Sequence, residues 1–238
     1  MGCPTLKSEL MRLWISLLVA AGMIQAAYSE LEKARDTQDR PALERLAKQF
    51  SAAAKNQPGD ATAQYRAALA HSYLAEVAIE QHDKARAIEA AESGIEAAQR
   101  AVTLNSSTAE YYRLLGTLCG QAVSSSGLLG LRYGKCALDS VNKAIELDPR
   151  NPENYVSHGV GMYYLPAAFG GGVDLAIKDF RKAIELNSAS TDAWLWLGIA
   201  LRKQNHDAEA RAAFEKALRL NPDRLWAKEQ LDKTPATP

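Results

Sequence analysis

The sequence lacks a surplus of charge of either sign. Its 28 Lys and Arg residues balance 28 Asp and Glu residues among 238 residues, so the formal net charge at pH 7 is zero. A protein that binds nucleic acids broadly needs a surplus of Lys and Arg, because these side chains replace the counterions on phosphates. The balance therefore argues against a nucleic-acid partner.

Residue types that build catalytic and metal centres are also scarce. The chain has three cysteines and four histidines. In the sequence, no histidine stands with cysteines or carboxylates at the spacing of a metal site. No nucleophile is paired with a base and an orienting acid at recognisable positions. We therefore expect no metal, no cofactor and no catalytic residues.

Alanine, by contrast, is abundant, and proline is rare. The chain has 42 alanines, about 18% of its residues, and nine prolines. Alanine is the strongest helix former, whereas proline interrupts helices. Hydrophobic residues make up 47% of the chain, which is ordinary for a globular protein. The composition therefore predicts a helix-rich globular fold.

The amino-terminal segment has the pattern of a secretory signal peptide. Lys7 and Arg12 precede an uncharged apolar run from residue 13 to residue 24. This run has the length of a signal-peptide core and is shorter than the roughly 20 residues that span a bilayer. We interpret residues 1–27 as a cleaved signal and expect an exported protein, periplasmic or secreted, whose mature chain has no transmembrane helix. The alternative is an uncleaved segment that anchors the protein.

Five similar segments recur along the chain. They lie at residues 52–58, 100–106, 143–149, 182–188 and 216–222. Their first residues are separated by 48, 43, 39 and 34 positions. Each segment has the pattern of an amphipathic helix end followed by residues that stop a helix. A period in this range is typical of stacked helical units, in which each unit needs its neighbour to bury its apolar face.

The last unit, residues 191–224, resembles the tetratricopeptide repeat. The residues at the positions that define this pattern are Trp194, Leu197, Gly198, Leu201, Ala210, Phe214, Ala217 and Pro222. Gly198 and Ala210 are small enough for two helices to approach closely, and Pro222 ends the second helix. The resemblance implies an all-α fold, a solenoid of antiparallel helix pairs.

Weaker versions of the pattern divide the rest of the chain. We expect a degenerate half repeat at 28–60, units at 61–108, 109–151, 152–190 and 191–224, and a capping helix with a tail at 225–238. The repeat positions kept in the middle units are Gly116, Ala137, Gly159, Ala176 and Phe180. Extra residues in the two middle units predict enlarged loops between their helices, and we interpret residues 129–136 as part of one such loop.

One of these insertions indicates a particular family of repeat proteins. Residues 165–176 contain a proline, a phenylalanine and three consecutive glycines before the second helix of their unit. This pattern is similar to the T component of TRAP transporters. That resemblance implies an exported accessory protein that binds a periplasmic solute-binding protein, holds an apolar small ligand and forms a homo-oligomer.

Two cysteines remain in the mature chain. Cys119 lies late in the first helix of its unit and Cys136 early in the second. Antiparallel packing would bring them near each other, and an oxidising compartment would permit a bridge. Because the insertion between the helices leaves their distance open, a disulfide and two separate packed thiols both stay as alternatives.

The concave face is the candidate binding surface. In such arrays the first helix of each unit lines this face. The positions expected to point into it hold Tyr65, Leu69, Tyr73, Arg113, Val160, Tyr163, Tyr164 and Arg202. Tyrosine offers a large rigid contact area with a polar tip, and arginine supplies a directional charge. We predict a non-catalytic scaffold that binds a protein partner in this groove. The alternative for several of the tyrosines is that they only pack against the insertions.

Overall fold

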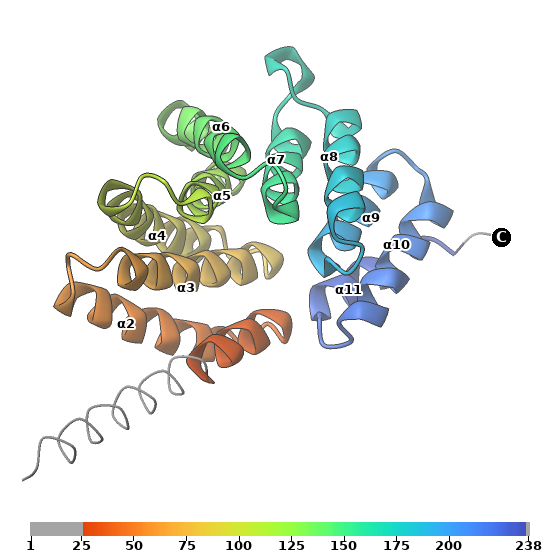
Figure 1. Cartoon of the computed structure of the whole chain (residues 1–238). Coiled ribbons are helices and arrows are strands. Elements are labelled where there is room, and N and C mark those ends of the chain that lie inside the picture. Colours follow the sequence, from red (N-terminus) through yellow and green to blue (C-terminus); the bar gives the residue numbers. More distant parts are fainter. Residues whose placement is uncertain (1–25, 237–238) are drawn as a thin grey trace, which may run out of the picture.

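The computed structural model describes residues 26–236, which form a curved array of helices (Figure 1). Residues 26–36 are helical and are followed by α2 (Arg40–Asn56), α3 (Ala61–Glu80), α4 (Lys84–Leu104), α5 (Ala109–Ser125), α6 (Gly130–Leu147), α7 (Pro152–Tyr164), α8 (Val173–Leu186), α9 (Thr191–Lys203), α10 (Asp207–Leu220) and α11 (Leu225–Asp232). Two 3₁₀ turns, η1 (Gly127–Leu129) and η2 (Ala167–Phe169), precede α6 and α8. Because residues 26–236 contain no strand, the all-α prediction is confirmed for that range.

Consecutive helices pack as the pairs α3/α4, α5/α6, α7/α8 and α9/α10, which correspond to the four predicted units. The first helices of neighbouring units also contact each other, so α3, α5, α7 and α9 form a continuous inner layer. Figure 1 shows the second helices α4, α6 and α10 farther from the centre of the curve than their partners. This inner layer holds the positions that the sequence predicted to line a concave face.

Polar residues define where many of these helices begin. Asp39, Asp60, Asp83, Asn151 and Ser190 each accept a hydrogen bond from a backbone N–H in the first turn of the following helix. Such caps satisfy N–H groups that have no partner within the helix. The local sequence therefore determines where these helices begin and where the short turns lie.

The repeat glycines lie where two helices come closest. A Cβ atom added at Gly159 or Gly198 would lie 2.6 Å from a ring atom of Phe180 or Phe214, respectively. At Gly116 the same atom would lie 2.5 Å from the Val141 side chain. The remaining repeat positions are the buried Ala176, Leu197, Leu201, Ala210 and Ala217, the partly buried Ala137 and Trp194, and the exposed Pro222 just after α10. Small residues thus allow the helices of a pair to pack without a gap.

The apolar core is divided along the array. One cluster of buried residues extends from Leu31 to Tyr133 and a second from Met162 to Ala227. A small cluster of Val156, Ala183 and Ala193 joins α7, α8 and α9. This division is expected of a solenoid, in which each unit buries its apolar face against its neighbours.

Two details differ from the expectation. The half repeat at 28–60 is a helix pair, because residues 26–36 form a helix whose Leu31 is fully buried in the same core cluster as Leu43 and Leu46 of α2. The predicted loop at 129–136 is mostly the first turns of α6. Its Tyr133 is buried and donates a hydrogen bond to Glu92 of α4, and this contact favours helix over loop. The enlarged loop predicted for the next unit is present at residues 165–172.

The predicted signal segment, apart from Ala26 and Ala27, lies outside the described residues. Among residues 26–236, no helix is long and apolar enough to cross a membrane.

Candidate interaction surface

The inner face of α3 is defined by the spacing of its residues. Tyr65, Leu69, Tyr73, Glu76 and Glu80 follow one another at intervals of three or four positions. Side chains at this spacing lie on one side of a helix. The three predicted groove residues of α3 therefore share their face with two carboxylates at its carboxyl end.

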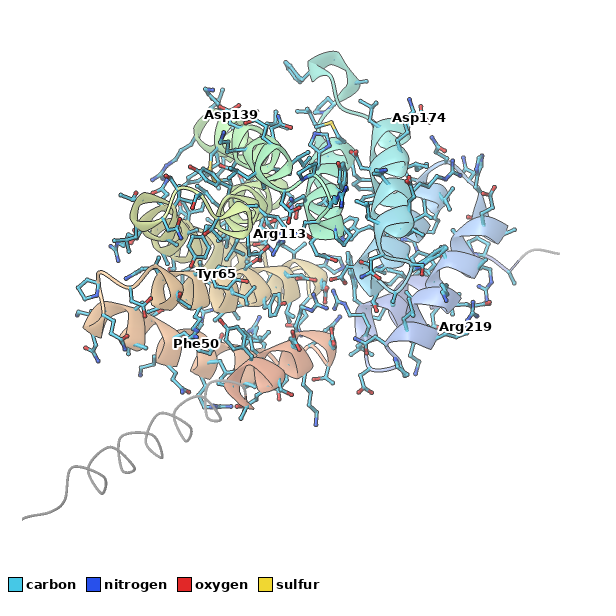
Figure 2. All side chains as sticks on the ribbon, in the orientation of Figure 1. Phe50, Tyr65, Arg113, Asp139, Asp174 and Arg219 are labelled. Atoms are coloured by element: carbon cyan, nitrogen blue, oxygen red, sulfur yellow. A yellow bond between two sulfur atoms is a disulfide. The ribbon has the colours of Figure 1, made fainter. Side chains whose placement is uncertain are left out.

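The amino-terminal part of this face forms a hydrogen-bond network across three helices. The Tyr65 hydroxyl donates to Glu110 Oε1 at 2.9 Å, and Arg113 Nε donates to Glu110 Oε2 at 2.6 Å. Arg113 also reaches Ser157 of α7 at 3.3 Å, while the Tyr65 ring stacks on Tyr111 with centroids 5.3 Å apart. In Figure 2, Tyr65 and Arg113 lie in the interior of the array. These two predicted groove residues join adjacent units.

The charges in this network stabilise each other. Burial raises the pKa of the Glu110 carboxyl, but Arg113 outweighs this effect and leaves the pKa below its ordinary value. For the Arg113 guanidinium, burial lowers the pKa. Glu110 raises it by more, so the pKa lies above its ordinary value. Both groups are therefore ionised at neutral pH.

Leu69 and Tyr73 are packed within the interior. Leu69 is buried, and the Arg35 guanidinium lies 4.9 Å from the centroid of the Tyr73 ring. Burial is the largest cause that raises the pKa of Tyr73, to about 12. Both side chains contribute more to the packing of the array than to an open surface.

The carboxyl end of α3 meets the carboxyl-terminal part of the chain through Arg224. This residue lies in the turn between α10 and α11 and is fully buried. Its Nη2 atom donates to Glu76 Oε1 at 2.5 Å and to Glu80 Oε1 at 2.7 Å. Its Nε atom lies 3.8 Å from carboxylate oxygens of both Asp36 and Asp192. One arginine thus contacts acids from three other parts of the fold.

A second arginine completes this cluster. Arg35 Nη1 donates to Asp192 Oδ2 at 2.8 Å, and its Nη2 donates to Asp36 Oδ1 at 3.0 Å. Asn221 also donates to Asp36, at 2.7 Å. We call the group Arg35, Asp36, Glu76, Glu80, Asp192 and Arg224 the clasp. The array curves so that its last helices return toward its first, as Figure 1 shows, and the clasp joins these two ends.

The clasp contains two cations and four acids, and burial affects their protonation. Burial raises the pKa of Glu80 to about 8, although Arg224 acts to lower it. Burial likewise raises the pKa of Glu76. For Asp192, the effect of burial is outweighed by Arg35 and Arg224, so its pKa lies below the ordinary value. Protonation of Glu80 as the pH falls through about 8 limits the excess of negative charge in the cluster.

The carboxyl-terminal half of the inner layer carries an aromatic cluster. Trp196 of α9 makes edge contacts with Tyr163 and Tyr164 of α7, at centroid distances of 5.9 and 6.2 Å. The Lys203 ammonium lies 4.2 Å from the centroid of the Tyr163 ring. Tyr164 is 47% exposed, and Val160 packs against the same apolar core as Tyr163 and Trp196. The predicted residues Val160, Tyr163 and Tyr164 therefore lie near one another, and Tyr164 faces solvent.

Arg202 is placed differently from the other predicted residues. Its guanidinium donates to the Gln230 carbonyl oxygen at 2.9 Å and to Thr234 Oγ1 at 3.2 Å. It therefore holds the end of α11 against α9.

The structure joins Cys119 and Cys136 in a disulfide. Their Cα atoms are 6.0 Å apart, and Cys119 is fully buried. The bridge links α5 to α6 across the turn that contains η1. Of the two alternatives left open by the sequence, the structure contains the bridge.

Within residues 26–236, no three His, Cys, Asp or Glu side chains gather in a way that could hold a metal ion. A cavity of about 150 Å³ lies between α2, α3 and α4. It is lined mainly by charged and polar side chains, among them Glu44, Lys48, His71, Arg86 and Glu89.

The sequence reasoning missed the clasp. Glu76 and Glu80 continue the helical spacing of Tyr65, Leu69 and Tyr73, so extending that face would have found them. The arginine partner comes from a position 144 residues farther along the chain than Glu80. Arg224 and Glu80 are close because the whole array curves, and the local spacing of residues does not predict that curvature.

The chain is similar to a short part of two curated proteins. The human protein O-mannosyl-transferase TMTC1 is 32% identical over 101 residues, which are 41% of this chain and 11% of that protein. Mouse TMTC1 is 29% identical over 128 residues, or 52% of this chain and 12% of that protein. The chain thus spans only a small part of the length of these curated relatives.

Two solved structures share the fold. TTC0263, a thermophilic tetratricopeptide repeat protein of Thermus thermophilus, has a TM-score of 0.61 at 17% identity, covering 87% of this chain and 97% of that chain. The HusA haemophore from Porphyromonas gingivalis has a TM-score of 0.54 at 21% identity, covering 85% and 96%. Together with the helix pairs described above, these likenesses establish an α-solenoid of the tetratricopeptide type.

Two family models match the sequence. The tetratricopeptide repeat model matches residues 191–224, which supports the resemblance of this segment to that repeat. A second model, described as regulator of microtubule dynamics protein 1-3, matches residues 22–165, which is more than half of the chain. The chain therefore belongs to the family of regulators of microtubule dynamics proteins 1-3.

Proposed function

We propose that this protein is an exported, non-catalytic scaffold that binds a protein partner on its concave face. The observation that carries the proposal is the aromatic cluster of Tyr163, Tyr164 and Trp196, where an exposed tyrosine and Lys203 stand on a rigid helical layer. Tyrosine and tryptophan are enriched among the residues that dominate binding energy at protein interfaces. The repeat fold supports the same proposal, since stacked helical units form extended concave binding surfaces.

The test is to recover the protein from its own host and measure what remains bound by native mass spectrometry. The wild type is expected to retain a protein partner that Y163A/Y164A loses. Y155A is the matched control, because Tyr155 lies on the same helix but its hydroxyl donates to the Pro149 carbonyl oxygen. A partner held equally by wild type and Y163A/Y164A would contradict this placement of the binding surface.

Export is part of the same proposal, and the disulfide supports it. Disulfides persist in oxidising compartments and are rare in the cytosol. The recovered protein is expected to lack about 27 residues, as the signal-peptide pattern predicts. A full-length mass would reject cleavage and favour the anchored alternative.

The family supports a second candidate function, which is contact with microtubules. Its description names regulation of microtubule dynamics, and its match includes α2 through α7. Co-sedimentation with polymerised microtubules tests this candidate directly. Protein that pellets only when microtubules are present would favour it, and protein that stays in the supernatant would exclude direct binding.

The T component of TRAP transporters remains the alternative predicted from the insertion. It requires a periplasmic solute-binding protein as partner or an apolar ligand, and a homo-oligomer. The charged lining of the cavity between α2, α3 and α4 does not suit an apolar ligand. The same native mass spectra address this alternative, since a co-purified solute-binding protein or an apolar adduct would favour it.

The name of the TMTC1 relatives includes a transferase, but the chain spans too little of them to carry over that activity.

A further inference from the structure

Two leucines beside the α5–α6 turn are almost fully exposed. Leu128 in η1 is 85% exposed, and Leu131 in the first turn of α6 is 98% exposed. A single exposed leucine is common on protein surfaces, but both side chains here stand within four positions of each other at the tip of one turn. Leaving both in water forfeits the favourable burial of two large apolar side chains.

The tip that carries these leucines is held rigidly. Leu129, between them, packs against the amino-terminal core. The disulfide at Cys136 ties α6 to α5, and Tyr133 donates a hydrogen bond to Glu92 of α4 at 2.9 Å. The leucines are therefore presented by a fixed support, so that little conformational entropy is lost when they bind.

Two basic residues follow the leucines in the chain. Residues 127–136 include Arg132 and Lys135 but no acid. The Arg132 and Lys135 side chains are 68% and 86% exposed, and each pairs with a partly exposed acid, Glu92 or Asp139. Exposed ion pairs of this kind are weak, so a more highly charged surface can replace these acids as the partner of each cation.

A tip with protruding leucines and adjacent cations complements an anionic bilayer. The apolar side chains enter the boundary between headgroups and acyl chains, while lysine and arginine are attracted to anionic lipids. A protein partner would instead need a cavity shaped to receive two protruding side chains. We propose that Leu128 and Leu131 insert into the interface of an anionic lipid membrane, with Arg132 and Lys135 at the headgroup phosphates.

The corresponding turn of the next unit has a related feature. Phe169, in η2 between α7 and α8, is 75% exposed. Successive units therefore both present an apolar side chain at the turn that joins their first and second helices. Phe169 gives a second apolar position at which contact with lipid can be tested.

The proposal is tested by flotation of the full chain with vesicles. One set of vesicles contains phosphatidylcholine and phosphatidylglycerol, and the other contains phosphatidylcholine alone. We expect L128S/L131S to lower the partition coefficient about 100-fold, since burial of each leucine accounts for about a factor of 10 or more. R132A/K135A is expected to weaken binding to the anionic vesicles several-fold for each cation and to leave binding to neutral vesicles unchanged.

The control is L104S/L147S, which removes two leucines that are 44% and 37% exposed at the ends of α4 and α6. This variant is expected to bind like the wild type. Thermal unfolding of every variant checks that the fold is retained. Failure of the wild type to float, or equal flotation of wild type and L128S/L131S, overturns the proposal. Loss of a co-purified protein from L128S/L131S with no change in flotation would assign the tip to a protein partner and also overturn it.

Discussion

Two glycines on α7 show how a single residue sets the spacing of two helices. An added Cβ at Gly159 would lie 2.6 Å from Phe180, whereas an added Cβ at Gly161 would have no atom within 4 Å. Both positions are helical, so the preference of the backbone for alanine over glycine is the same at each. The difference between the two substitutions therefore isolates the cost of helix packing.

We expect G159A to lower the free energy of unfolding by about 1–3 kcal/mol, because overpacking forces side chains and backbone to shift. G161A is expected to raise it by roughly 0.5–1 kcal/mol. Urea unfolding followed by circular dichroism measures both. Equal effects of the two substitutions would show that α7 and α8 have room to separate.

Arg224 is the residue whose loss should cost most. Replacing it by methionine leaves Glu76 and Glu80 buried without their cation, and breaking a buried pair in this way costs about 3–5 kcal/mol. The matched control is R219M, because Arg219 lies exposed near the end of α10, where Figure 2 shows it at the outside of the array. R219M should change stability by less than about 0.5 kcal/mol. Chemical denaturation compares the two variants, and similar midpoints would mean that the clasp contributes little.

Glu80 gives the clasp a dependence on pH. Its pKa rises from 4.5 to about 8 in the folded protein, so the folded state binds this proton more tightly than the unfolded state does. The stabilisation from this group is complete below about pH 4.5 and is lost as the pH rises through about 8. E80Q should therefore remove a decline in stability that the wild type shows across this range. Unfolding measured at several pH values tests it, and parallel curves for the two proteins would contradict the assignment.

At the scale of elements, the α5/α6 pair depends on its disulfide. The bridge joins residues 17 positions apart, and closing a loop of this size is worth about 3 kcal/mol. C119A/C136A should lose about that much stability relative to the oxidised wild type. Thiol titration of the denatured, unreduced protein should detect no free thiol at these two positions. Two free thiols there would show that the cysteines remain unbridged.

In the α5/α6 pair, the sequence pattern predicted a loop where the structure has a helix. An insertion relative to the repeat predicts a loop, but residues 130–136 continue as helix because Tyr133 packs against α4 and bonds to Glu92. The insertion in the α7/α8 pair contains Pro166 and the glycines at 170–172, two of which have positive φ values. Proline and such glycines stop a helix locally, so this loop was predictable.

At the scale of the whole molecule, the clasp holds the two ends of the array together. Arg224 contacts Glu76 and Glu80 of the first full unit, while Arg35 reaches Asp192 at the start of the last unit. Solenoids are otherwise held by contacts between neighbouring units, so their curvature is soft. We expect this contact between distant units to fix the curvature of the array.

Loss of the clasp should therefore change the shape as well as the stability. We expect R224M to have a larger radius of gyration than the wild type in small-angle X-ray scattering, while its helical content by circular dichroism stays the same. R219M again serves as the control. An unchanged scattering curve for R224M, with the helices intact, would show that the contacts between neighbouring units alone set the curvature.

The local features of this protein follow from its sequence. Helix-period spacing, capping residues such as Asp60, Asn151 and Ser190, and small residues at Gly159 and Gly198 act over a few positions, so they can be read without a structure. The repeat units and the face of α3 that carries Tyr65 and Tyr73 were predictable for this reason.

Only the tertiary structure determined which of these side chains remain available. Tyr73 is covered by Arg35, and Arg202 is bonded to the end of α11, while Tyr164 remains exposed. These outcomes depend on small rotations between successive units, which add up along the array until its ends meet. Because that sum involves every unit at once, no local pattern could place Arg224 among acids more than 140 residues away along the chain.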